Sequence, residues 1–149
     1  MTGPLPVGAR IGILGDGQLG RMLACEAAKL GFDTSVFGPE PDSPASRVAA
    51  HSVCADYDNL EALIAWGKTC AIVTYEFENV PVLSARALLD AGVGVRPGSQ
   101  PLEVAQDRVA EKTFLRGCGI ATADFAVIER SQDIAEPLQA FGGKGILKT

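Results

Sequence analysis

The sequence lacks the features that mark membrane, secreted and zinc-binding proteins. Its 149 residues contain no apolar run near the roughly 20 residues needed to cross a bilayer. The first ten residues, MTGPLPVGAR, show no charged segment followed by an apolar one, so we expect no signal peptide and no membrane contact. The four cysteines form no C-x-x-C pair and there is one histidine, which argues against a metal site. Thiols spaced this widely predict buried, reduced cysteines in a cytoplasmic protein, with a disulfide as the alternative.

Basic residues are also scarce. Thirteen Lys and Arg face 18 Asp and Glu, so the formal net charge is −5 and the pI about 4.8. A nucleic-acid surface needs a basic face that neutralises phosphates, and this balance argues against one. A small anionic ligand stays open, because a helix N-terminus and a few local cations suffice to bind it.

What the sequence does contain is an alternation of short apolar strands and helices. The strands are predicted at 10–15, 32–38, 52–55, 70–76 and 93–98, and the helices at 18–30, 60–67 and 82–89. Such alternation predicts βαβ units and an open, doubly wound parallel sheet of the α/β class. Ligands of such sheets bind at the carboxyl ends of the strands, near the point where the strand order reverses. In the first helix Leu19, Met22, Leu23, Ala27 and Leu30 fall on one face, as in an amphipathic helix.

The pattern changes after Gly98. A longer charged helix is predicted for about 99–119, a strand for 123–128, a helix for 131–141 and a last strand for 145–149. We therefore expect two domains, a complete one over residues 1–98 and the beginning of another over residues 99–149. The apolar strand at the C-terminus has nothing after it, which is typical of an unfinished domain.

The stretch IGILGDGQLGRML, residues 11–23, carries the strongest local motif. Gly15, Gly17 and Gly20 have the spacing G-x-G-x-x-G between a strand and a helix, where backbone amides can approach a phosphate closely. NAD binding also requires an acid at the end of the second strand, and Gly38 stands there instead. The loop by itself leaves three interpretations open: NAD, a single phosphate, or a structural turn.

Further motifs favour one interpretation. GDGQLGRML, VTYEFENVP, RPG and EVAQDRVAEKTFL followed by GI occur in an order and at distances that resemble the N5-carboxyaminoimidazole ribonucleotide synthetases. These are ATP-grasp ligases of purine biosynthesis, and the resemblance extends from Ile11 to Lys148. It implies a Rossmann-like pre-ATP-grasp domain followed by the start of an ATP-grasp domain. The implied reaction joins bicarbonate to 5-aminoimidazole ribonucleotide with consumption of ATP, and the implied form is a cytoplasmic enzyme, with a homodimer as one assembly.

The resemblance also implies site residues. Gly17, Gln18 and Leu19 would hold the phosphate region of the ribonucleotide, and Glu76 would accept hydrogen bonds from its ribose hydroxyls. Arg108 and Lys148 would contact ATP. Each has a plainer interpretation. Gln18 could be a solvated residue of the first turn, Leu19 could belong to the core, and Arg108 could form an exposed ion pair with a neighbouring acid. Without the motif, Lys148 would be just a terminal lysine.

Other residues near these motifs have two interpretations as well. Arg21 either lies near the phosphate or faces water. Glu78 points to the same side as Glu76 in an extended chain, and one of the pair could instead cap the next helix. Asn79 is a weaker candidate for binding the substrate.

Two rival functions remain from the sequence: an NAD-linked oxidoreductase domain and a binding module without chemistry. We identify no catalytic residue in the chain and expect the magnesium ligands to lie outside it. The 149-residue chain alone is therefore predicted to be inactive.

Overall fold

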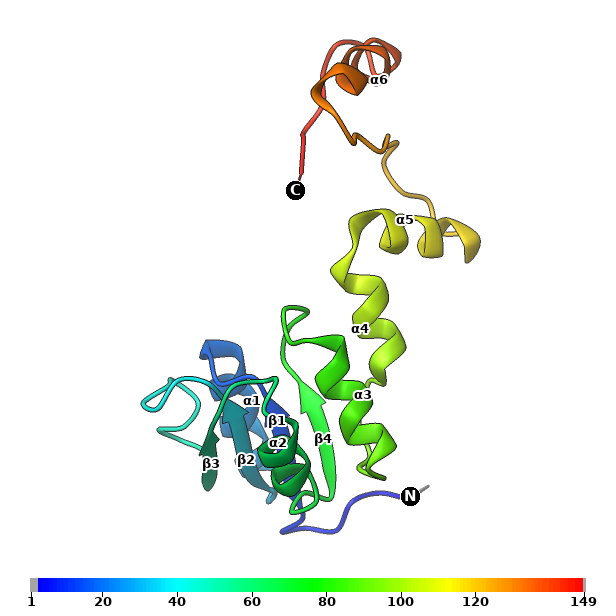
Figure 1. Cartoon of the computed structure of the whole chain (residues 1–149). Helices are drawn as coiled ribbons and strands as arrows, with labels where there is room; N and C mark the ends of the chain where they lie inside the picture. The colour runs from blue at the N-terminus through cyan, green and yellow to red at the C-terminus, as the bar shows by residue number, and fades with distance from the viewer. Residues whose placement is uncertain (1–2, 149) are drawn as a thin grey trace. The chain divides into compact units, whose positions relative to one another are not determined.

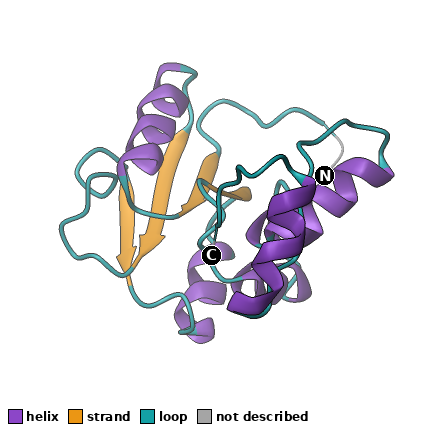
Figure 2. Ribbon diagram, turned by 90° about the horizontal axis from the view of Figure 1, so that it is seen from above, coloured by secondary structure: helices purple, strands orange, loops and turns teal. Residues whose placement is uncertain are grey.

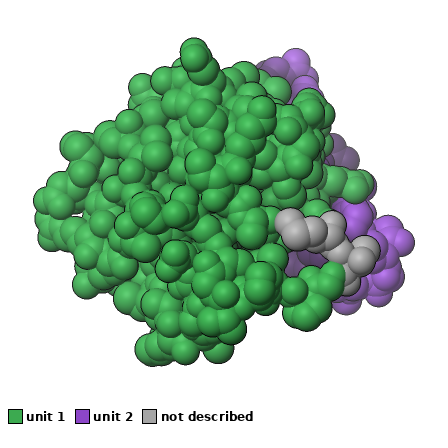
Figure 3. Space-filling view, turned by 90° about the horizontal axis from the view of Figure 1, so that it is seen from below, with its two compact units in different colours: residues 1–106 green, residues 107–149 purple. Residues whose placement is uncertain are grey.

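In the computed structural model, residues 3–148 are described, and the chain forms two compact units, residues 1–106 and 107–149 (Figure 3). The division falls after Gln106, where one helix ends. The boundary predicted after Gly98 separates two domains of a larger protein and not two compact units of this chain, so it stays a prediction. Each unit is described below by itself.

The first unit is built on a parallel sheet (Figure 1). Its strands are β1 (Arg10–Leu14), β2 (Asp33–Gly38), β3 (His51–Cys54) and β4 (Ile72–Tyr75), and its helices are α1 (Gln18–Lys29), α2 (Leu60–Gly67), α3 (Val82–Asp90) and α4 (Ser99–Gln106). The strand order is β3-β2-β1-β4, so the chain leaves β1 in one direction and returns past it to β4. The predicted α/β class with a parallel sheet is confirmed.

Strand alternation divides the core into two layers. Ile13 and Val36 point to the face covered by α1, where they cluster with Ala24. Leu14 and Phe37, the next residues along the same strands, belong to the larger cluster that α2 and α3 complete. Helices thus cover both faces of the sheet, as the view from above shows (Figure 2). Nearly all of β2 is buried, as expected of a strand inside such a sheet.

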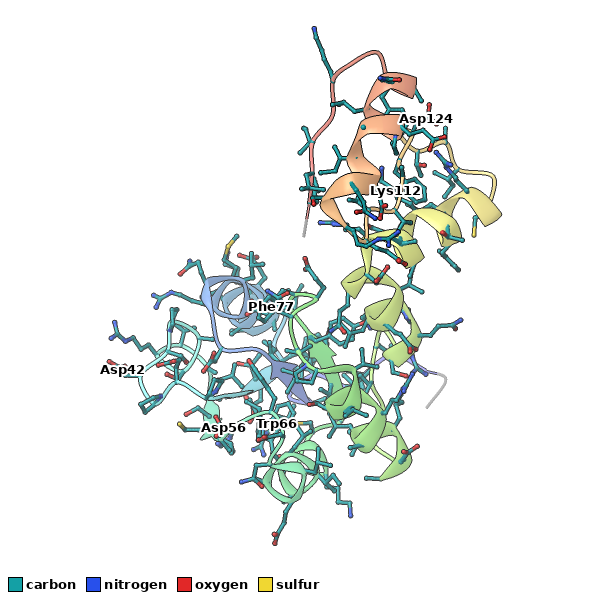
Figure 4. All side chains as sticks on the ribbon, turned by 45° about the horizontal axis from the view of Figure 1, so that its top comes forward. Asp42, Asp56, Trp66, Phe77, Lys112 and Asp124 are labelled. Carbon is teal, nitrogen blue, oxygen red and sulfur yellow. The ribbon has the colours of Figure 1, made fainter. Side chains whose placement is uncertain are left out.

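A buried polar pair joins α2 to the sheet. The indole Nε1 of Trp66 donates a hydrogen bond to Oγ of Ser35 at 2.8 Å, and its ring lies 5.2 Å from that of Phe37. Figure 4 labels Trp66 at this position between α2 and the strands. Because each buried polar atom has the other as its partner, the pair satisfies both groups and fixes the rotation of α2.

The fifth strand predicted at 93–98 is reduced to one bridge. Val73 pairs with Val95 in parallel, through its amide bonded to the carbonyl of Gly94 and its carbonyl bonded to the amide of Arg96. Pro97 follows directly and has no N–H to donate, so the ladder cannot continue. The prediction of a full strand over 93–98 is therefore wrong, and the structure shows that the segment lies beside β4.

The second unit contains α5 (Arg108–Gly117), the 3₁₀ helix η1 (Ser131–Ile134) and α6 (Ala135–Ala140). The single helix predicted for 99–119 is wrong, because Asp107 breaks it. Asp107 has an extended backbone, and its carboxylate accepts a hydrogen bond from the amide of Ala110 at 2.7 Å. It is therefore the N-cap of a new helix.

Both strands predicted in this unit are wrong for the described residues. Residues 123–128 and 145–148 are irregular, and Thr149 lies outside the described part. A strand is stable only when a neighbour pairs with its backbone, and the described residues of this unit offer none. The helix predicted for 131–141 is confirmed as η1 and α6 together.

The cysteines are free, but the prediction that they are buried is wrong. Cys54 and Cys118 are exposed, and Cys25 and Cys70 are only partly buried. Burial still raises the pKa of the Cys70 thiol above its usual value, which keeps that group protonated near neutral pH. Among the described residues no helix is long and apolar enough to span a membrane.

Candidate functional site

The candidate site lies where β1, β2 and β4 end. The strands are parallel and in register, with Leu14 opposite both Phe37 and Tyr75, so their carboxyl ends meet at one edge of the sheet. The next residue of the chain, Gly15, is tied to this edge because its amide donates to the carbonyl of Phe37 at 2.9 Å. This is the edge at which ligands of open α/β sheets bind.

Two of the loop glycines are required by close contacts. Gly15 has φ of +122°, a conformation that side chains disfavour, and a Cβ there would lie 2.5 Å from Cγ of Glu76. A Cβ on Gly20 would lie 2.8 Å from the carbonyl oxygen of Gly15. The first glycine therefore allows the turn and the approach of Glu76, and the third allows α1 to begin directly against the loop.

Glu76 lies over the glycine loop. It follows β4 immediately, and its Oε1 would be 2.9 Å from a Cβ on Gly15 and 3.2 Å from one on Gly17. Its other oxygen, Oε2, is buried and has no hydrogen-bond partner among the described residues. Buried carboxylate oxygens are normally hydrogen-bonded, so this atom is an acceptor that awaits a donor. The structure thus brings together two predicted site residues, Gly17 and Glu76.

The N-terminus of α1 is open to a ligand. Its N-cap, Gly17, makes no side-chain hydrogen bond, and the first turn holds no acid. In contrast, the side chain of Asn59 caps α2 by accepting from Ala62. The first amides of α1 and the positive end of its dipole therefore remain available for an anion. The side chains of Gln18 and Leu19 are exposed, the latter by 53%, so the interpretation of Leu19 as a core residue is wrong for this chain.

A cavity of about 290 Å³ adjoins Glu76. It is lined by Tyr75, Glu76, Phe77, Glu78, Pro97, Pro101, Leu102 and Ala105. Phe77, labelled in Figure 4, is one of these residues and stands at the end of β4. Most of these residues are apolar and two carry carboxylates, which suits a small ligand that has both a flat ring and hydroxyl groups.

Tyr57 is a residue that the sequence reasoning missed. Its ring lies 6.4 Å from that of Phe37, and burial, followed by the charges of Asp16 and Glu76, raises its pKa to about 12. The phenol is protonated at neutral pH, as tyrosines ordinarily are, and the raised pKa keeps it a hydrogen-bond donor into the alkaline range as well. No local motif marks it, because it comes to the site through a loop after β3 that only the folded sheet places there.

Other residues near the motif have structural roles. The guanidinium of Arg21 donates to the carbonyl of Pro44 at 3.2 Å, so it holds the loop after β2 and does not simply face water. The carbonyl of Glu78 accepts from Gln106 at 2.6 Å, while its side chain is exposed. The N-cap of helix α3 is Pro81, and no side chain caps the helix, so the alternative that Glu76 or Glu78 caps it is wrong.

Arg108 and Lys148 belong to the second unit. Arg108 begins α5, and its Nη1 lies 2.7 Å from Oε2 of Glu111 in a partly exposed ion pair. Lys148 is exposed. Their contacts with ATP stay predictions. Over residues 3–148 no group of three or more His, Cys, Asp and Glu side chains is placed to hold a metal ion.

The parallel sheet, the glycine turn and the open helix N-terminus define a Rossmann-like α/β domain. Comparison with known families identifies it further: the profile of the ribonucleotide synthetase preATP-grasp domain matches residues 9–106. The chain belongs to this family.

Individual relatives are similar over nearly the whole chain. The N5-carboxyaminoimidazole ribonucleotide synthase of Brucella melitensis is 43% identical over 144 residues, which are 97% of this chain and 40% of that protein. An N5-carboxyaminoimidazole ribonucleotide synthetase solved with ADP superimposes with a TM-score of 0.87 at 33% identity, over 94% of this chain and 37% of that one. The synthase of Aspergillus clavatus, in complex with ADP and 5-aminoimidazole ribonucleotide, gives 0.79 at 30% identity, over 91% and 37%. The chain therefore spans about two fifths of the length of such a relative.

Proposed function

We propose that this chain forms the N-terminal part of an N5-carboxyaminoimidazole ribonucleotide synthetase. Such a ligase carboxylates 5-aminoimidazole ribonucleotide with bicarbonate at the expense of ATP, in purine biosynthesis. The observation that carries the proposal is the buried, unpartnered Oε2 of Glu76 beside the glycine loop. The relatives support it, since one was solved with both ADP and this ribonucleotide.

Each part of the ribonucleotide has a matching group in the first unit. Oε2 of Glu76 has no hydrogen-bond donor among the described residues, and the ribose hydroxyls can supply one. A carboxylate can accept hydrogen bonds from two such hydroxyls. The 5′-phosphate is an anion that suits the amides of Gly17, Gln18 and Leu19 at the start of α1. The flat imidazole suits the apolar cavity next to Glu76.

ATP is the second substrate of the proposed reaction and supplies the phosphoryl group that activates bicarbonate. Arg108 and Lys148 are cations of a kind that binds its phosphates, and we propose that they do so. Magnesium would accompany ATP, but no described cluster fits it, so we assign it no ligand in this chain. We also propose that the whole ligase is located in the cytoplasm and forms a homodimer. Free cysteines are in keeping with a cytoplasmic location.

The test is an amide chemical-shift titration of the 149-residue chain with the ribonucleotide, and with ATP in a separate run. We expect the ribonucleotide to shift the amides of Gly17, Gln18, Leu19 and Glu76. Replacing Glu76→Gln should weaken binding about tenfold or more, because a charged acceptor of hydroxyl donors is lost. The matched control is Glu61→Gln on α2, whose exposed carboxylate does not line the cavity and should have little effect. ADP release in the presence of bicarbonate should stay at background for this chain alone.

Two results would contradict the proposal. One is binding of the ribonucleotide that leaves the glycine loop unshifted. The other is equal affinity of Glu76→Gln and the unmodified chain.

A further inference from the structure

The carboxylate of Asp16 lies against the end of β2. Asp16 stands between the first two glycines of the loop and is only 9% exposed. A Cβ on Gly38, the last residue of β2, would lie 2.5 Å from its Oδ2 and 2.7 Å from its Oδ1. Position 38 therefore tolerates no side chain while the carboxylate is in place, although the two residues are far apart in the sequence.

Asp16 is held in this position by the loop after β2. Its Oδ2 accepts a hydrogen bond from the amide of Glu40 at 3.0 Å, and its carbonyl accepts one from the amide of Ala45 at 3.0 Å. The loop is thereby folded over the strand end. The carboxylate is directed at the protein's own backbone and has an amide partner without any ligand.

The two sides of the sheet edge consequently differ in free space. At the β2 end the cavity measures about 10 Å³, enough for one water molecule. At the β4 end it measures about 290 Å³. A dinucleotide placed on a glycine loop puts its adenosine ribose at the end of the second strand, and pockets for such ligands measure roughly 300–1,000 Å³.

We propose that Asp16 is a specificity-determining residue that closes the β2 end and confines a nucleotide to the β4 side. The G-x-G-x-x-G loop of this chain then accepts a mononucleotide and excludes NAD and NADP. This inference concerns which nucleotide class fits the loop, and it stands whether or not the ligand is the aminoimidazole ribonucleotide.

The contact itself is tested by a double-mutant cycle in urea unfolding. Gly38→Ala should destabilise the chain, because the new methyl group meets the Asp16 carboxylate. The same change should be close to neutral in the Asp16→Gly background, where that space is empty. Equal destabilisation in both backgrounds would overturn the contact.

The specificity is tested by amide chemical-shift titration with NAD. The unmodified chain should show no shift over residues 38–46. The double variant Asp16→Gly with Gly38→Asp opens the space and supplies the acid that NAD requires at the end of the second strand, so it should gain such shifts with affinity increased by roughly tenfold or more. Asp16→Ala replaces Asp16→Gly in this pair if the double variant does not fold. Asp16→Asn is the matched control. It keeps the size and removes the charge, so it should still exclude NAD.

NAD-induced shifts over residues 38–46 of the unmodified chain would overturn the proposal. So would an opening variant that folds but gains no affinity. Because NAD is the probe, these outcomes are independent of the ribonucleotide titration.

Discussion

Tyr57 illustrates how a single residue reports on the charges around it. Burial and the nearby carboxylates of Asp16 and Glu76 raise its pKa from 10.0 to about 12, so the folded chain keeps the phenol protonated where the unfolded chain ionises it. The stability linked to this group is complete below pH 10 and is lost as the pH rises toward 12.

We expect Tyr57→Phe to reduce the loss of stability between pH 10 and 12 by about 1 kcal/mol, a value discounted for solvent screening at a half-buried site. Urea unfolding at a series of pH values measures it. Tyr75→Phe is the comparison variant. Tyr75 is the other tyrosine of the chain and burial raises its pKa as well, so this variant measures how much of the alkaline loss of stability comes from Tyr75. An unchanged alkaline loss in Tyr57→Phe would show that other groups cause it.

At this scale the sequence predicted residues whose role is local. The glycine spacing marks a turn before a helix, and Glu76 stands at the end of the strand predicted at 70–76, so both positions could be identified from the chain itself. The contact of Glu76 with a ribose came from the family resemblance and stays a prediction. Tyr57 and the contact between Asp16 and Gly38 could not be identified. They depend on where the loops after β2 and β3 fold, which no local pattern encodes.

Helix α1 shows how an element can be predicted correctly and its packing wrongly. Its predicted apolar face is largely exposed: Leu19 by 53%, Met22 by 56%, Leu23 by 43% and Leu30, just after the helix, by 70%. The buried residues are small, Gly20 and Ala24. At position 20 the helix lies so close to the carbonyl oxygen of Gly15 that a Cβ would be only 2.8 Å from it, which leaves room for glycine alone.

We therefore expect Ala24→Leu to destabilise the chain by about 1–3 kcal/mol, because a larger side chain does not fit between α1 and the sheet. Met22→Gln, the control on the exposed face, should change stability by less than about 0.5 kcal/mol. Urea unfolding of both variants shows which face of α1 packs against the sheet. A larger effect at Met22 would mean that the predicted apolar face is the one that packs.

For the molecule as a whole, burial separates the two units. Within residues 3–148 every buried hydrophobic residue lies in the first unit, the last being Leu102, and no residue from 107 to 148 is buried. Ile120, Val127, Ile146 and Leu147 are exposed by at least 53%. Because apolar burial is the main stabilising contribution to folding, the first unit carries the stability of the chain.

We accordingly expect amide hydrogen exchange to divide the chain near Gln106. Core strands such as β1 and β4 should exchange at the rate of global unfolding, and residues 107–148 should exchange orders of magnitude faster. Mass spectrometry of exchanged peptides measures both in one sample. Equal protection of α5 and β1 would contradict the assignment of stability to the first unit.

The sequence by itself determined β1 to β4, α1 to α3 and the glycine turn of the first unit, because these follow from short-range periodicity and from residues with particular backbone preferences. It also determined the family, since several motifs occur in order along the chain. Only the tertiary structure decided which face of α1 packs, that residues 93–98 form a single bridge, and that Asp16 closes the end of β2. Each of these depends on the distance between segments remote in sequence, and that distance is set by packing.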